Sequence, residues 1–190
     1  SNVDTEYRSQ LAALKDLRHK MELGDYEDPT VTTGSTGELD RRASPPVATG
    51  VPMDTLRKLN EALLEVPESF TIHRKLRKPL SKRIDALENG GIEFGHAEAL
   101  AFASLLGEGV HIRLTGQDTE RGTFSHRHLV LHDEKTGLEY CPMQCLEEAK
   151  APFELYNSPL SEMACLGFEY GYSAADPDAL VLWEAQYGDF

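Results

Sequence analysis

The stretch "HAEALAFASLLGEGVHIRLT", from His96 to Thr115, decides the fold class. Its first part is a helical run, whereas "VHIRLT" at its end is short and β-branched, which is typical of a strand. The alternation continues with strand candidates in "FELYN" and "ALVLWEA", which lie on either side of the helical run "SEMACLGFEYGYSAA". Helix and strand alternating at this spacing predict an α/β fold in which helices flank a parallel sheet.

Polar residues crowd the segment that follows the first predicted strand, "GQDTERGTFSHRHLVLHDE". Ligands of parallel sheets gather at the carboxyl ends of strands, and a core could not bury so many polar groups unpaired. The segment "EAQYGDF" follows another predicted strand, so we expect a shared site at this edge. Arg121 and Arg127 are candidates to face a ligand at this edge. The alternative for either arginine is an ordinary surface ion pair with Asp118 or Glu120.

The part of the chain before this region differs from it in composition and in the spacing of apolar residues. Residues 1–23 carry leucines and a methionine at spacings of three and four, which predicts an amphipathic helix. Residues 24–50 are rich in Pro, Gly, Ser and Thr without periodicity, which predicts a polar linker. Residues 51–90 are predicted to be a helical connector, with Asp54 capping one helix and paired glycines ending the next. The α/β domain occupies residues 91–190.

Charge and composition exclude several classes of protein. The chain of 190 residues has 19 Lys and Arg against 32 Asp and Glu, and its net charge of −13 argues against nucleic acid as a partner. It contains neither an apolar run of ~20 residues nor the pattern of a signal peptide, so we expect no membrane span and a cytoplasmic location. Three cysteines suit reduced intracellular thiols better than a disulfide framework.

Three motifs carry a resemblance to a known family. In their order, "GQDTERGTFSHRH", "YNSPLSEMACLGFEYGYS" and "ALVLWEAQYGDF" resemble the transketolase-like pyrimidine-binding domain of the thiamine-diphosphate-dependent decarboxylating component of 2-oxoglutarate dehydrogenase complexes. The segment "TGVPMDTLRKLNEALLEVPESF" resembles the helical region before that domain. The resemblance runs from about Pro46 to Phe190. It implies a partial parallel sheet with flanking helices, truncated at its C-terminal end and preceded by a helical region.

The resemblance also implies what the parent protein does. It would decarboxylate 2-oxoglutarate, or alternatively 2-oxoadipate, on thiamine diphosphate and pass the acyl group to a lipoyl-bearing succinyltransferase. A domain absent from this chain would bind the diphosphate and its magnesium, so the chain alone is expected to be inactive. The parent would be a homodimer in the bacterial cytoplasm, or in the mitochondrial matrix of a eukaryote.

Glu162 is the main candidate catalytic residue. Ser158 is a plausible N-cap and Pro159 a favoured first helical residue, which places Glu162 in the first turn, where a carboxylate complements the helix dipole. The resemblance implies instead that Glu162 hydrogen-bonds a ring nitrogen of the cofactor's aminopyrimidine and promotes deprotonation of the thiazolium carbon. It further implies catalytic roles for His126 and His128, and cofactor contacts for Gln117, Gln186 and Phe190.

Two other classes of protein are alternatives to this family. Imidazole and thiolate are zinc ligands, so His126, His128, His132, Cys141 and Cys145 suggest a structural zinc module, although their spacing is poor. A noncatalytic interaction module is the other alternative.

A sheet cut after "ALVLW" would leave an uncovered edge, so residues 180–190 are expected to mediate self-association.

Overall fold

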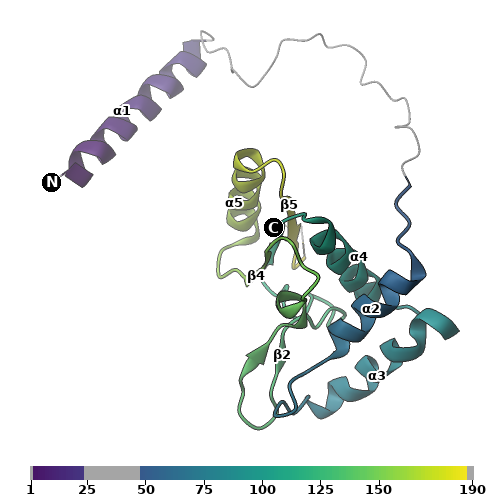
Figure 1. Cartoon of the computed structure of the whole chain (residues 1–190). Helices are drawn as coiled ribbons and strands as arrows, with labels where there is room; N and C mark the ends of the chain where they lie inside the picture. The colour runs from purple at the N-terminus through teal and green to yellow at the C-terminus, as the bar shows by residue number, and fades with distance from the viewer. Residues whose placement is uncertain (1, 24–47, 188–190) are drawn as a thin grey trace. The chain divides into compact units, whose positions relative to one another are not determined.

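The computed structural model describes residues 2–23 and 48–187, in two units divided between Thr49 and Gly50 (Figure 1). The first unit contains the helix α1 (Asn2–Leu23), in the region where an amphipathic helix was predicted. The side chains of Leu14, Leu17 and Met21, on which its apolar stripe was predicted, are outside the described residues. So is most of the predicted linker.

The second unit contains the predicted parallel sheet. Its three strands lie in the order β4-β1-β5, and both pairings are parallel, which confirms the α/β prediction. A small antiparallel pair, β2 and β3, forms a separate ladder. In chain order the elements are α2 (Met53–Leu64), α3 (Arg74–Asn89), α4 (Phe94–Glu108), β1 (Ile112–Gly116), β2 (Leu131–His132), β3 (Glu139–Tyr140), a 3-10 helix (Pro142–Cys145), β4 (Phe153–Asn157), α5 (Glu162–Ala175) and β5 (Leu180–Glu184).

The central strand β1 presents a different chemistry to each face of the sheet, because alternate side chains of a strand point in opposite directions. Ile112 and Leu114 join the hydrophobic core, to which α4 contributes Leu106 and its neighbours. Arg113 and Thr115 point to the other face, where they contact Glu169 and Cys165 of α5. The two helices therefore cover opposite faces of the strands (Figure 1).

Two predicted helix starts are wrong. Asp54 lies inside α2, where its carboxylate pairs with Arg57 at 2.7 Å, and the N-cap position is Pro52. The N-cap of α5 is Ser161 rather than Ser158, and its hydroxyl accepts a hydrogen bond from the Ala164 amide. Ser158 lies before the helix: its amide donates to the Gly116 carbonyl at 2.6 Å and so continues the strand pairing, and its hydroxyl accepts the Leu160 amide at 3.3 Å.

Two other expectations hold. The paired glycines end α3 as predicted, with Gly90 at the C-cap and at a positive φ of 77°. Glu162 lies in the first turn of α5. Among the helices in the described part of the chain, none has the length and hydropathy needed to cross a bilayer.

Candidate active site at the carboxyl edge of the sheet

The carboxyl ends of the three parallel strands bring the predicted site segments together. Gly116 of β1 pairs with Asn157 of β4 on one side and with Glu184 of β5 on the other. A Cβ atom on Gly116 would lie 2.4 Å from the Glu184 carbonyl oxygen and 2.8 Å from Thr119 Cγ2. Glycine is required here because the loop after β1 turns back directly over the end of β5.

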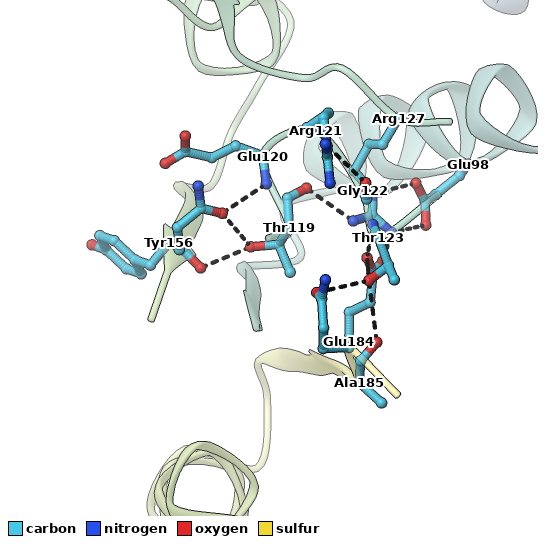
Figure 2. Close-up of polar contacts among 12 residues, drawn as sticks. Glu98, Thr119, Glu120, Arg121, Gly122, Thr123, Arg127, Tyr156, Glu184 and Ala185 are labelled. Carbon is cyan, nitrogen blue, oxygen red and sulfur yellow. Dashed lines mark hydrogen bonds and ion pairs between the residues drawn. The ribbon is translucent and has the colours of Figure 1, made fainter. Parts of the chain in front are cut away.

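The loop after β1, residues 117–128, is tied to the end of β4 (Figure 2). The Thr119 hydroxyl donates to the Tyr156 carbonyl at 2.7 Å, and the Glu120 amide donates to Asn157 Oδ1 at 3.1 Å. Arg121 pairs with Asp118, as predicted for a surface arginine. These bonds fix where the loop leaves the sheet.

Arg127, near the end of the same loop, is buried and joins three parts of the fold (Figure 2). Only 3% of its side chain is exposed. Its guanidinium donates to both carboxylate oxygens of Glu98 on α4, at 2.7 and 3.0 Å, and also to the Thr119 carbonyl at 2.9 Å. A fourth bond goes to Glu184 at the end of β5. This network was not predicted from the sequence, because Arg127 was expected on the surface or facing a ligand.

Glu184 links this network to the tip of the loop. Its Oε2 accepts from Arg127, whereas Oε1 accepts from the Thr123 amide at 2.9 Å and the Thr123 hydroxyl at 3.0 Å. Burial alone would raise the pKa of Glu184, but the bonds from Arg127 and Thr123 outweigh it and lower the pKa below its ordinary value. For Arg127, burial alone would lower the pKa, but the bonds to Glu98 and Glu184 outweigh it and raise the pKa above its ordinary value.

Glu162 is buried at the start of α5, with 8% of the residue exposed. Its Oε1 accepts hydrogen bonds from the backbone amides of Gln186, at 2.9 Å, and Tyr187, at 2.8 Å. The carboxylate therefore holds the segment that immediately follows β5. Glu162 also lies in the first turn of α5, where its carboxylate complements the helix dipole, so that alternative role stays open.

Two of the other predicted cofactor residues form hydrogen bonds to Glu162 or to the segment just before it. Gln117 is exposed and donates to the Leu160 carbonyl at 3.0 Å, two residues before Glu162. Gln186, whose amide bonds Glu162, also places its side-chain oxygen 3.4 Å from the Thr123 hydroxyl. Phe190, the third cofactor residue, lies outside the described residues.

The two predicted catalytic histidines have other surroundings. The His126 ring packs against Phe94 and Phe124, with centroids 5.9 and 6.4 Å apart, and among the described residues its buried Nδ1 has no hydrogen-bond partner. His128 has a positive φ of 49° and lines a cavity of about 220 Å³ together with Arg83 of α3. Burial lowers the pKa of His128, which favours the neutral ring. No contact that we describe joins either ring to Glu162.

The zinc alternative finds little support. In residues 2–23 and 48–187, no three His, Cys, Asp or Glu side chains gather closely enough to hold a metal ion. Burial raises the pKa of the Cys141 thiol to about 11, which disfavours the thiolate that zinc requires. His132 lies on the exposed ladder and has 58% of its side chain accessible.

The strand order and the buried carboxylate at the carboxyl edge define an α/β domain of the kind that binds a ligand beyond its parallel strands. Residues 90–190 match the family described as "Transketolase, pyrimidine binding domain", and the chain belongs to this family. This finding confirms the fold that the three motifs predicted.

Relatives extend the similarity beyond that domain. The chain is 57% identical over 146 residues to the "2-oxoglutarate dehydrogenase E1 component" of Bacillus cereus (strain AH820), a match that covers 76% of this chain and 15% of the relative. It is 52% identical over 170 residues to the protein of the same name from Oceanobacillus iheyensis, covering 89% of this chain and 17% of the relative. The chain thus spans about one sixth of the length of these relatives.

Proposed function

We propose that this chain is part of the decarboxylating component of a 2-oxoglutarate dehydrogenase complex and supplies the pyrimidine-binding wall of its thiamine diphosphate site. The observation that carries the proposal is the buried carboxylate of Glu162 at the carboxyl edge of the sheet, held by two backbone amides. The names of the relatives and the family of residues 90–190 support the same function.

The residues at this edge suit the aminopyrimidine half of thiamine diphosphate. A buried carboxylate can share a proton with a ring nitrogen, and side-chain amides such as those of Gln117 and Gln186 offer both donors and acceptors. When bound, the cofactor supplies an acidic carbon that adds to the ketone of a 2-oxo acid and takes up the electrons left by carbon dioxide.

Each of the predicted site residues has a separate role in this proposal. Glu162 holds the proton at the pyrimidine nitrogen, and Phe190 packs against the ring. His126 and His128 donate hydrogen bonds near the entering 2-oxoglutarate, whose carboxylates suit such donors. The diphosphate and magnesium are bound by another domain of the parent, and a lipoyl-bearing succinyltransferase receives the acyl group. The bacterial relatives support a cytoplasmic location.

A first prediction follows from the division of the cofactor site between domains. The 190-residue chain, supplied with thiamine diphosphate, magnesium and 2-oxoglutarate, is expected to show no decarboxylation above the uncatalysed rate. Without a domain to hold the diphosphate, the cofactor is not fixed near Glu162, and the advantage of positioning is lost. Release of labelled carbon dioxide from carboxyl-labelled substrate measures the activity. Turnover by the chain alone would contradict the divided site.

The proposed parent is a homodimer, and the surface of α5 supports self-association. Only one edge of this helix is buried, through Glu162, Cys165 and Glu169. On its other side Met163 and Tyr170 are 75% and 76% exposed, and in the described part of the chain no other element lies within 4 Å of a Cβ built on Gly167. Large apolar surface of this kind is uncommon on a monomer. The strand β5 next to it is an edge of the described sheet.

A second prediction concerns this surface. The chain is expected to sediment faster as its concentration rises, because α5 and residues 180–187 contact a second copy. Met163→Lys should weaken the association by placing a charge in the apolar contact. Leu138→Lys, at an exposed leucine next to β3, is the matched control and should leave it unchanged. A monomer at every concentration, or an equal effect of both variants, would contradict the assignment.

A further inference from the structure

Three side chains clamp the end of β5, and we call Arg127, Glu184 and Thr123 the β5 clamp (Figure 2). Glu184 accepts from Arg127 on one carboxylate oxygen and from Thr123 on the other. The Thr123 hydroxyl also lies 3.2 Å from the Ala185 carbonyl. Since Arg127 is held in turn by Glu98 of α4, the clamp ties the end of β5 to the core helix and to the loop after β1.

The clamp is two residues away from the groups that hold Glu162. The chain passes from Glu184 through Ala185 to Gln186 and Tyr187, whose amides donate to Glu162 Oε1 at 2.9 and 2.8 Å. These donors come from irregular backbone after the strand, so no sheet ladder fixes their direction. Their orientation depends on how the residue before them is held.

The charges of the clamp suit a rigid support. Arg127 and Glu184 have 3% and 18% of their side chains exposed, and the lowered pKa of Glu184 means that it is ionised at neutral pH. Hydrogen bonds between ionised partners are shorter and stronger than neutral ones. Glu184 also uses both carboxylate oxygens as acceptors, which glutamine cannot reproduce because its amide nitrogen would face a donor.

We propose that the β5 clamp sets the orientation of the Glu162 carboxylate, so that Arg127, Glu184 and Thr123 are positioning residues for Glu162 although none of them touches it. This inference rests on the proposed function of Glu162. Its structural part concerns the amides of Gln186 and Tyr187 and can be measured separately from any chemistry.

The sheet offers a matched control for a test on Glu184. Glu154 of β4 pairs with Arg113 of β1, as Glu184 pairs with Arg127, and each arginine keeps a second carboxylate, Glu169 or Glu98. Glu154 has 27% of its side chain exposed, and its other oxygen lies 3.5 Å from His111. Glutamine at 154 can still accept from Arg113 and donate to His111. Glu154→Gln therefore perturbs an ion pair of the same sheet without touching residues 184–187.

The first measurement is amide hydrogen exchange in the 190-residue chain. Glu184→Gln is expected to speed exchange at Gln186 and Tyr187 by about tenfold, while Glu154→Gln leaves both rates unchanged. Thr123→Val, which removes only the hydroxyl, should give a smaller increase at the same two amides. Unchanged exchange in Glu184→Gln would overturn the proposal whatever the function of Glu162.

The second measurement is kinetic and uses the complete polypeptide that contains this chain. Glu184→Gln is expected to lower kcat on the order of 10- to 100-fold with little change in KM, because Glu162 is misplaced rather than removed. In a Glu162→Gln background, adding Glu184→Gln should change kcat by less than about twofold, since the two residues act as one unit. If Glu184 has a purely structural role, Glu184→Gln should lower kcat in that background as much as it does in the wild type, and this result would overturn the proposal.

The two measurements separate this inference from the proposed function. Faster exchange in Glu184→Gln, combined with full activity of Glu162→Gln, would support the positioning of the carboxylate and refute its catalytic role. Unchanged exchange combined with an inactive Glu162→Gln would refute the clamp and support the catalytic role.

Discussion

Glu162→Gln in the complete polypeptide is expected to lower turnover of 2-oxoglutarate by on the order of 10²–10⁴, with a much smaller change in the affinity for thiamine diphosphate. Glutamine has the size of glutamate, and its oxygen can still accept the amides of Gln186 and Tyr187. It cannot share a proton with the pyrimidine nitrogen as a carboxylate does. The variant therefore separates the chemistry of Glu162 from its role in holding the segment after β5.

The measurement is kcat at saturating cofactor, together with a cofactor titration. Glu169→Gln is the matched control, because Glu169 is also a buried carboxylate of α5 and pairs with Arg113 at 2.8 Å. That variant is expected to reduce stability while leaving kcat unchanged at temperatures where the protein stays folded. If Glu162→Gln turns over at the normal rate, Glu162 has only a structural role.

Arg127→Met is expected to destabilise the 190-residue chain by about 3–5 kcal/mol, measured by urea denaturation at neutral pH. Methionine fills a similar volume but leaves Glu98 and Glu184 without their shared cation. Two carboxylates that lie close together in a partly buried site then repel each other and lose their charged hydrogen bonds. Arg121→Met, which removes a half-exposed arginine paired with Asp118, should cost at most about 1 kcal/mol.

The difference between Arg127→Met and the wild type should shrink in acid. The folded-state pKa of Glu184 is lowered, so its stabilising contribution is present above its unfolded-state pKa and is lost as the pH falls through the folded value. In the variant, Glu184 has lost the cation that holds it ionised, and a protonated carboxyl is less costly to bury. An equal destabilisation at all pH values would contradict the ionic origin of the effect.

Features that depend on residues close together in the sequence were predictable from the sequence. The alternation of helical and β-branched runs was enough to predict the parallel sheet of β1, β4 and β5, because the spacing of apolar side chains is a local property. Glu162 was placed in the first turn of α5 from a capping sequence whose N-cap was three residues too early, and the expected gathering of site segments at one edge holds for Gln117 and Gln186. The roles of Glu162, His126 and His128 came from the resemblance of three motifs and stay predictions.

Only the tertiary structure decided which polar groups are partners. Ser158 has a favourable capping sequence, yet its amide continues the pairing with Gly116, and Ser161 caps the helix instead. Arg127 lies 29 residues from Glu98 and 57 from Glu184, and no local pattern marks it as different from Arg121. A helix or strand is specified by contacts within a few residues, whereas a buried ion pair requires strand register and helix packing to bring distant charges to bonding distance.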